Sequence, residues 1–258
     1  MDLHLSGKSA LITGASKGIG YGIAQALAAE GCNLHLVARN GDELEKAQAA
    51  LRAAYPGVAV DIHSMDMSRA DAAQTLLESC RHVDILINNA GGIPNGAIDA
   101  VDEATWRRAW DIKVFGYINM TRAFLAEMRE RRAGVIINIV GAAAERVKVG
   151  YVAGSTGNAA LMAFSRAVGS DSLDYGVRVL AINPGLIKTE RLQMRFEQMA
   201  KTELGDSSRW REIMARVPQV GEPSDIGAMA AFLASDRARF ITGVAITVDG
   251  GAAARTPL

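Results

Sequence analysis

The chain has 258 residues, of which 49% are hydrophobic and 22% charged, as expected for a globular protein with a buried core. Lysine plus arginine and aspartate plus glutamate both number 28, so net charge gives no reason to expect nucleic acid or an anionic membrane as a partner. The two cysteines lack the spacing of metal ligands, so we expect no metal site. The sequence has no apolar run near the roughly 20 residues of a membrane span and no apolar core of a signal peptide. We therefore expect a soluble, cytoplasmic protein.

Short apolar runs alternate with amphipathic segments along the chain, which is typical of a parallel sheet covered by helices. The expected strands are residues 9–13, 33–38, 59–65, 84–89, 134–140, 178–183 and 244–249. Helical spacing of apolar residues fills the intervals, and the longest helices are expected at about 105–131 and 155–173. Because no repeat or flexible linker interrupts this order, we expect one α/β domain over residues 1–258.

The segment 188–217 breaks the alternation of strands and helices. It combines three methionines, a phenylalanine and a tryptophan with many charged residues. Two interpretations are open. The segment forms two surface helices, or it forms a mobile substrate lid at the carboxyl ends of the strands, where open α/β sheets bind ligands.

A glycine-rich turn, LITGASKGIG, joins the first expected strand to the first expected helix. Gly14 allows a tight turn, while Gly18 and Gly20 let the backbone approach a pyrophosphate and let the helix pack closely on the sheet. The helix N-terminus offers free N–H groups to the phosphates. Because the motif follows a strand and opens a helix, it predicts dinucleotide binding, and the same turn places Ser16 and Ile19 beside the ligand.

Arg39 ends the second expected strand, where sites that prefer NAD usually carry an acid for the ribose diol. Together with Lys17 in the glycine turn, it would receive a 2′-phosphate instead. The alternative is that both side chains are solvated surface cations. The pattern favours NADP over NAD.

Four segments in series extend this pattern: TGASKGIG, NNAG (88–91), INPGLIKT (182–189) and ITGVAITVDGG (241–251). With them, the sequence resembles the single-domain short-chain dehydrogenase/reductase family. The resemblance implies a Rossmann-type doubly wound sheet of about seven parallel strands with helices on both faces, and a homotetramer or homodimer. It also implies cofactor contacts from Asp66 and Met67 at the adenine, from Asn88, Ala90 and Gly91 at the adenosine ribose, and from Pro184, Gly185, Ile187 and Thr189 at the nicotinamide end.

The family's catalytic residues, Asn, Ser, Tyr and Lys, are all replaced. Their flanking segments place Lys113 at the Asn position, Gly141 at the Ser position, Gly154 at the Tyr position and Asn158 at the Lys position. Hydride transfer creates or consumes an alkoxide whose proton must move at the same time, so a working enzyme needs other acid/base groups.

Lys113 and Asn158 exchange the residue types of two family positions that face each other. We hypothesise that Lys113 reaches the space of the missing lysine, where loss of water would lower its pKa and make it an acid or base. The alternative is that Lys113 points to solvent or to a carboxylate such as Asp111. Asn158 keeps the ability to hydrogen-bond a ribose hydroxyl.

Three other side chains are candidates for the rearranged catalytic set. Tyr151 is either a displaced tyrosine near the pocket or a loop aromatic under the lid, and its match to the family motif is interpreted as accidental. Ser155 is either a donor on the pocket floor or a helix N-cap. Glu145, with Arg146, either faces the substrate or forms a surface ion pair.

The glycines at 141, 154 and 157 remove side chains from the expected pocket floor. We expect them to enlarge the space beside the nicotinamide, since glycine inside a helix costs about 1 kcal/mol relative to alanine. The four histidines lie in or near expected strands and are interpreted as structural.

Three functions are compatible with these observations. The first is an NADP- or NAD-dependent oxidoreductase that acts on a small carbonyl or alcohol with a rearranged acid/base set. The second is a non-redox enzyme of hydratase, lyase or hydrolase type on the same fold. The third is a nucleotide-binding pseudoenzyme or regulator. The intact cofactor motifs favour the first.

Overall fold

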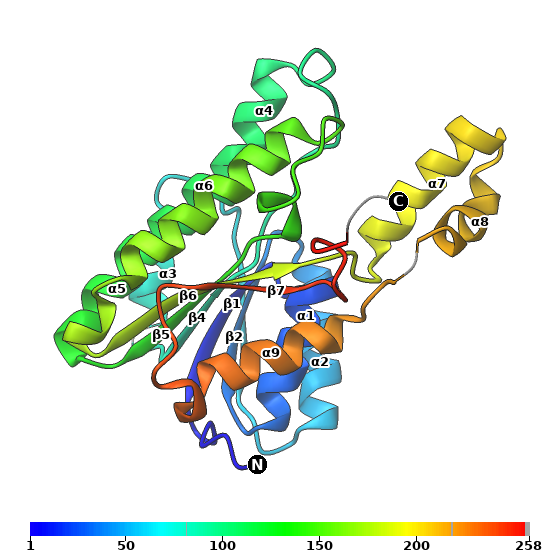
Figure 1. Cartoon of the computed structure of the whole chain (residues 1–258). Helices are drawn as coiled ribbons and strands as arrows, with labels where there is room; N and C mark the ends of the chain where they lie inside the picture. The colour runs from blue at the N-terminus through cyan, green and yellow to red at the C-terminus, as the bar shows by residue number, and fades with distance from the viewer. Residues whose placement is uncertain (81, 218, 256–258) are drawn as a thin grey trace.

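Seven parallel strands form one sheet in the order β3-β2-β1-β4-β5-β6-β7 in the computed structural model, which describes residues 1–80, 82–217 and 219–255 (Figure 1). The strands are β1 (Ser9–Thr13), β2 (Asn33–Ala38), β3 (Val60–Ser64), β4 (Ile85–Asn88), β5 (Gly134–Ile139), β6 (Val177–Pro184) and β7 (Ala245–Val248). The strand order reverses between β1 and β4, so the expected Rossmann-type doubly wound sheet is confirmed. Each strand ends within one residue of its predicted bounds.

Helices cover both faces of this sheet (Figure 1). One face carries α1 (Gly18–Ala29), α2 (Gly41–Ala54) and α9 (Pro223–Ala234). The other carries α3 (Ala72–Ser79), α5 (Gly116–Arg131) and α6 (Val152–Gly169). No helix in the described ranges combines the length and the apolar character that a membrane span requires.

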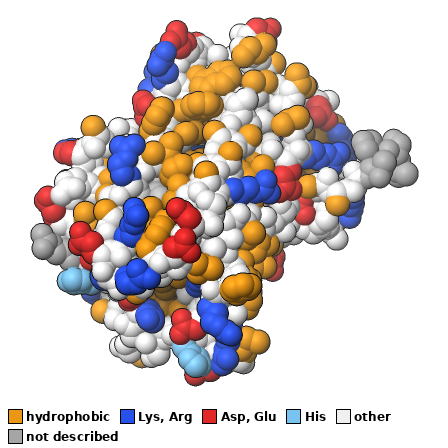
Figure 2. Space-filling model, turned by 60° about the vertical axis from the view of Figure 1, so that its left-hand side comes forward, with side chains coloured by type: hydrophobic (Ala, Val, Ile, Leu, Met, Phe, Trp, Pro, Cys, Tyr) orange, Lys and Arg blue, Asp and Glu red, His pale blue; other side chains and the backbone are white. Residues whose placement is uncertain are grey.

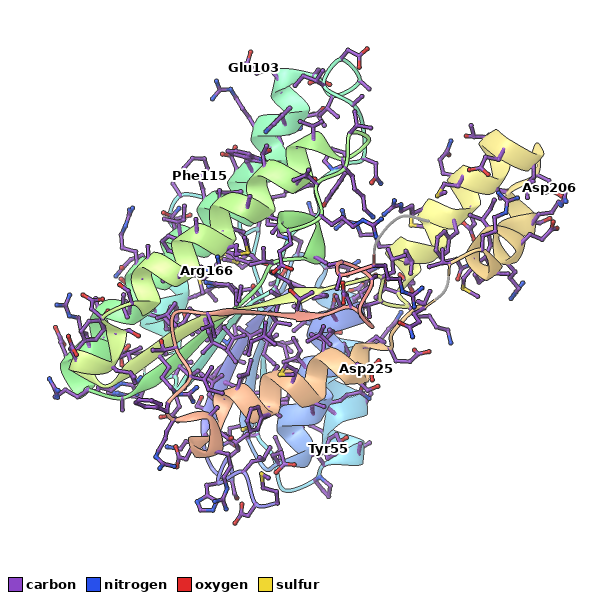
Figure 3. All side chains as sticks on the ribbon, in the orientation of Figure 1. Tyr55, Glu103, Phe115, Arg166, Asp206 and Asp225 are labelled. Atoms are coloured by element: carbon purple, nitrogen blue, oxygen red, sulfur yellow. The ribbon has the colours of Figure 1, made fainter. Side chains whose placement is uncertain are left out.

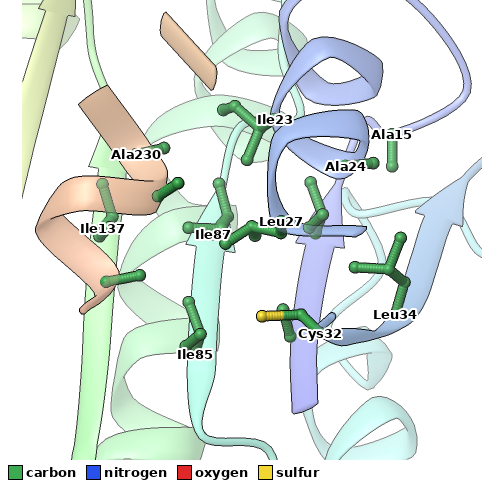
Figure 4. Close-up of a cluster of buried hydrophobic side chains, with 14 of the residues drawn as sticks. Ala15, Ile23, Ala24, Leu27, Cys32, Leu34, Ile85, Ile87, Ile137 and Ala230 are labelled. Carbon is green, nitrogen blue, oxygen red and sulfur yellow. The ribbon is translucent and has the colours of Figure 1, made fainter. Parts of the chain in front are cut away.

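The hydrophobic core between α1 and the sheet explains why α1 is amphipathic. Ile23 and Leu27, one turn apart on α1, are fully buried and lie over Ile87 of β4 (Figure 4). Ala230 of α9 closes the other side of the cluster, and its small side chain lets α9 approach α1. Complete burial of each such aliphatic side chain contributes about 1.5–3 kcal/mol to the free energy of unfolding. This packing holds α1 on the sheet and so stabilises the strand ends that carry the site.

The long helix expected at 105–131 is interrupted. It consists of α4 (Glu103–Trp110), a π-helical turn (Asp111–Phe115) and α5, which follows at once. A π turn inserts an extra residue and rotates the side chains that it carries, and such turns are frequent at functional sites. Lys113 lies at the centre of this turn.

The segment 188–217 contains α7 (Glu190–Leu204) and α8 (Trp210–Ala215), which project away from the sheet (Figure 1). Leu192, Phe196 and Ile213 bury their side chains against each other in a cluster separate from the main core. Asp206 lies at the outer end of this pair (Figure 3). Both helices are therefore anchored mainly to each other and at the start of α7.

Candidate active site

Two cavities lie at the carboxyl ends of the strands, where ligands bind in open α/β sheets. The first, called here the glycine-turn cavity, is lined by residues that follow β1, β2 and β3. The second, called the lysine cavity, is lined by Lys113 and by residues that follow β5 and β6, and has a volume of about 470 Å³. Gly91 and Arg191 line both, so the cavities are adjacent.

Glycine is required where the first cavity meets the sheet. Gly14 has φ +67, and a Cβ there would lie 2.9 Å from the Cα of Ala90. The helix α1 begins at Gly18, and its N-cap residue Lys17 makes no side-chain capping hydrogen bond. The first N–H groups of α1 are therefore available to an anion.

Asn89 holds the glycine turn in place, although the sequence analysis did not single it out. Its Nδ2 donates to the carbonyl oxygens of Thr13, at 2.9 Å, and Gly14, at 3.0 Å. The neighbouring Asn88 has a different role from the one expected. It is fully buried, and its Nδ2 donates to Thr121 Oγ1 and Asn138 Oδ1 inside the core. Asn88 was expected at the adenosine ribose, but β4 turns its side chain into the sheet interior, and it lines neither cavity.

Most of the other expected cofactor residues line the cavities. Around the glycine-turn cavity lie Gly14, Ser16, Lys17, Arg39, Asp66, Met67, Ala90 and Gly91. Around the lysine cavity lie Ile19, Pro184, Gly185, Ile187 and Thr189. The chain thus brings these expected residues to one continuous edge of the sheet.

The two cations expected at a 2′-phosphate differ in their surroundings. Lys17 Nζ lies 3.0 Å from Glu43 Oε1 and 3.1 Å from Glu190 Oε2, and the bond to Glu43 is the main reason that its pKa is raised. Arg39 is exposed and makes no ion pair within the described parts of the chain. Arg39 is therefore the cation that remains available to a phosphate.

Lys113 extends into the second cavity rather than into solvent. Its Nζ donates to the carbonyl oxygen of Val140 at 2.6 Å. A Cβ on Gly91 would lie 2.8 Å from the Cβ of Lys113, so only glycine at position 91 leaves room for the Lys113 side chain. Burial, with a smaller effect from Arg191, lowers the pKa of Lys113 to about 7. The alternative interpretation, a lysine facing solvent or Asp111, is wrong.

Tyr151 occupies the place of the side chain that Gly154 lacks. A Cβ on Gly154 would lie 1.9 Å from Cζ of the Tyr151 ring, so the ring covers the Gly154 backbone. Tyr151 lines the lysine cavity. Its burial raises the pKa of the phenol, which Arg191 and Arg195 partly offset. The Tyr151 ring therefore forms part of the cavity wall beside the Gly154 backbone.

The glycines do not enlarge the cavity as expected. Besides the Tyr151 ring over Gly154, the Asn158 amide lies 2.9 Å from the place of a Cβ on Gly141. A Cβ on Gly157 would lie 3.1 Å from Nε1 of Trp110. Neighbouring side chains fill the space, so these glycines serve close packing.

Of the three remaining catalytic candidates, one lines the lysine cavity and two lie outside its lining. Asn158 lines the lysine cavity, and its buried Oδ1 has no hydrogen-bond partner among the described residues. Ser155 is buried and accepts a bond from the Lys148 N–H at 3.2 Å. Glu145 Oε1 accepts from Asn183 and Thr247 rather than pairing with Arg146. Ser155 and Glu145 therefore support the loop and do not line either cavity.

A histidine–cysteine cluster lies outside both cavities, on strands β2 and β3 and at the end of α3. His63 Nε2 is 3.2 Å from Nδ1 of His35 and 3.3 Å from Sγ of Cys80, and one ligand atom of each lies within 4.8 Å of the others. Burial lowers the pKa of both imidazoles, so they are neutral at pH 7 and bond to each other. His35, His63 and Cys80 are far apart in the sequence, so only the packing of β2, β3 and α3 brings them together.

Comparison with known proteins gives matches over almost the whole chain. A family model described as enoyl-(acyl carrier protein) reductase matches residues 14–253. The chain is 32% identical over 258 residues to D-beta-hydroxybutyrate dehydrogenase from Cupriavidus necator, covering 96% of this chain and 98% of that protein. It is 35% identical to galactitol 2-dehydrogenase (L-tagatose-forming) from Cereibacter sphaeroides, with 96% of each chain covered. Among solved structures, L-sorbose reductase from Gluconobacter frateurii, complexed with NADPH and L-sorbose, has a TM-score of 0.90 and 31% identity, covering 99% of this chain and 100% of that one.

Proposed function

Because this chain belongs to the short-chain dehydrogenase/reductase family, we propose that it is an NADP- or NAD-dependent oxidoreductase acting on a small carbonyl or alcohol. The observation that carries the proposal is that Lys113 and Tyr151 line one cavity together with residues 184–187 and Thr189. The similar proteins named above are dehydrogenases and a reductase, which favours redox chemistry over the hydratase, lyase or hydrolase alternative and over a pseudoenzyme.

The residues present fit a dinucleotide. The uncapped start of α1 would hold the pyrophosphate, Asp66 the adenine and Arg39 a 2′-phosphate. The unpartnered Oδ1 of Asn158 would accept a hydrogen bond from a ribose hydroxyl. When bound, the nicotinamide cofactor supplies or accepts the hydride at the substrate carbon.

Lys113 is the proton carrier in this proposal. Its pKa of about 7 lets the amine exchange a proton near neutral pH, where a general acid or base is most effective. The bond to Val140 fixes Nζ in the cavity. Lys113 gives a proton to the substrate oxygen during carbonyl reduction and takes it back during alcohol oxidation. Tyr151 remains a neutral phenol because its pKa is raised, so its hydroxyl donates a hydrogen bond to the same oxygen.

The helices α7 and α8 serve as the substrate lid. Arg191 at the start of α7 donates to the carbonyl oxygens of Gly91, at 3.2 Å, and Ile93, at 2.6 Å, and so crosses the boundary between the two cavities. Leu192 and Arg195 of α7 also line the lysine cavity. Closure of such a segment excludes water from the reacting groups.

Turnover tests the function directly. Absorbance of the nicotinamide at its reduced band should change when the protein is mixed with cofactor and a panel of small carbonyls and alcohols. Tight cofactor binding without turnover across the panel would instead favour a nucleotide-binding regulator. Substrate consumption at constant nicotinamide absorbance would favour non-redox chemistry.

Arg39→Ala is expected to weaken NADPH binding by about tenfold or more and to change NADH binding by about twofold or less, because only NADPH carries the 2′-phosphate. Fluorescence titration of the reduced nicotinamide measures both affinities. Arg239→Ala, an exposed change after α9 that lines neither cavity, is the matched control. Equal losses for NADPH and NADH would contradict the assignment of Arg39.

We place the assembly on the face that carries α5 and α6. Hydrophobic side chains gather on the molecular face that Figure 2 brings forward. Phe115, at the junction with α5, is 51% exposed, and Leu173, just after α6, is 40% exposed. A homotetramer or homodimer would bury this surface. Light scattering should give two or four times the chain mass, and Phe115→Glu should lower it; an unchanged mass would exclude this face.

We propose the cytoplasm as the compartment, since Cys32 and Cys80 are buried free thiols.

A further inference from the structure

Cations dominate the lysine cavity. Its charged lining residues are Lys113, Arg146, Lys148, Arg191, Arg195 and Arg255, together with a single carboxylate, Asp249. That carboxylate is already occupied, because Oδ1 accepts from the Gly251 N–H at 2.8 Å and Oδ2 accepts from the Ala253 N–H at 2.6 Å. Hydrogen bonds do not remove the charge of Asp249, and Lys113 is only partly protonated near pH 7, but the other cations outnumber the carboxylate. The wall therefore carries a net positive charge, although the whole chain is neutral.

None of these six cations makes an ion pair within residues 1–80, 82–217 and 219–255. Three of them are held by backbone carbonyls: Lys113 by Val140, Arg191 by Gly91 and Ile93, and Arg146 by Ala252. In the same ranges, the side chains of Lys148 and Arg195 donate no hydrogen bond. Their donors are therefore available to a ligand.

Lys148 and Arg195 line the same cavity from different elements. Lys148 lies on the loop between β5 and α6, and Arg195 lies one turn after Arg191 on α7. Burial lowers the pKa of Lys148, and charge repulsion from Arg195 and Arg146 lowers it further. A bound anion would relieve that repulsion.

The cofactor does not account for these two residues. Neither Lys148 nor Arg195 lines the glycine-turn cavity, where the start of α1 and Arg39 offer donors to phosphates. Arg191 lines both cavities, so its charge is shared between the two sites.

We infer that the substrate is an anion, a hydroxy or keto compound whose carboxylate or phosphate group is held by Lys148 and Arg195 while its reacting oxygen faces Lys113 and Tyr151. This inference rests on the proposed function for the reacting end and on the cation cluster for the anionic end.

Binding of malonate, a small dicarboxylate, tests the anion site without turnover. Titration calorimetry at low salt should show binding of malonate and none of its uncharged dimethyl ester. Lys148→Gln and Arg195→Gln should each weaken malonate by about tenfold, because each removes one charge-assisted bond. Arg239→Gln, an exposed change after α9 on the opposite face of the sheet, should leave the affinity unchanged. Equal malonate affinity in the wild type and the Lys148→Gln/Arg195→Gln double variant would overturn the inference.

Paired substrates identify the anion and separate this inference from the proposed function. A 3-oxo acid is compared with its methyl ester, and a ketose phosphate with the free ketose, with reduced cofactor present. The charged member of one pair should have a kcat/KM about 100-fold higher, a preference that Lys148→Gln/Arg195→Gln should reduce at least about tenfold. A preference for the 3-oxo acid would identify the anion as a carboxylate, and a preference for the ketose phosphate would identify it as a phosphate. Turnover without any preference for the charged substrate would contradict the anion site but not the oxidoreductase. Malonate binding that depends on Lys148 and Arg195, without any turnover, would contradict the oxidoreductase but not the anion site.

Discussion

Lys113→Met should lower kcat by about 10²–10⁴-fold while leaving cofactor affinity within about twofold of the wild type. The reason is that methionine keeps the length and apolar stem of lysine but cannot carry a proton. The π-helical turn and Gly91 hold the side chain in the cavity, so the variant changes one reacting group and little else. Single-turnover nicotinamide absorbance measures the chemical step, and nicotinamide fluorescence measures binding.

The same variant has a stability signature that a solvent-exposed lysine would not give. Burial lowers the pKa of Lys113 from 10.5 to about 7. Between these values the unfolded chain binds a proton that the folded chain does not, so this residue makes stability rise with pH. Below about pH 7 both states are charged, and the full cost of the buried charge is present. Lys113→Met should therefore gain most stability relative to the wild type at pH 6 and less at pH 9, as urea unfolding can measure. A gain that is independent of pH would contradict the burial of this charge.

Gly154→Ala should lower stability by about 1–3 kcal/mol and reduce activity, although alanine is the better helix former by about 1 kcal/mol. The new methyl group would lie 1.9 Å from the Tyr151 ring, so the ring must leave its position. Because the phenol is proposed to hold the substrate oxygen, displacement should affect kcat more than cofactor binding. Urea unfolding and steady-state kinetics provide the two readouts.

Two further variants make the result specific to the ring. Gly150→Ala places its methyl group in open space, with no atom within 4 Å, and should be close to neutral. In a Tyr151→Ala background the clash is absent, so adding Gly154→Ala should cost no stability. If Gly154→Ala is as harmful in that background as alone, the contact with the ring is not the cause.

The fold and the cofactor half were predictable because local rules act there. Each strand is an apolar run bounded by turns, and Gly14 needs its positive φ whatever surrounds it. The roles of Asn88 and Asn89 were not separable in the sequence. Adjacent strand residues point to opposite faces, and only the structure shows that Asn88 points inward and Asn89 holds the turn.

The catalytic half was less predictable because its geometry depends on contacts between distant segments. Gly154 predicted free space in the pocket, whereas the ring of Tyr151 fills that space from the preceding turn. Lys148 and Arg195 line one cavity from a loop and from a helix more than 40 residues later, which no spacing rule reveals. The π turn that aims Lys113 gives no recognisable signal in DIKVF.

The pH dependence of single-turnover hydride transfer tests the central claim most directly, namely that Lys113 replaces the missing acid/base residues. With a carbonyl substrate and reduced cofactor, the wild-type rate should fall as pH rises through about 7, because protonated Lys113 is the acid. In the alcohol-oxidising direction it should rise through the same pH. Lys113→Met should lose this dependence in both directions. The same pH dependence in the wild type and the variant would contradict the account.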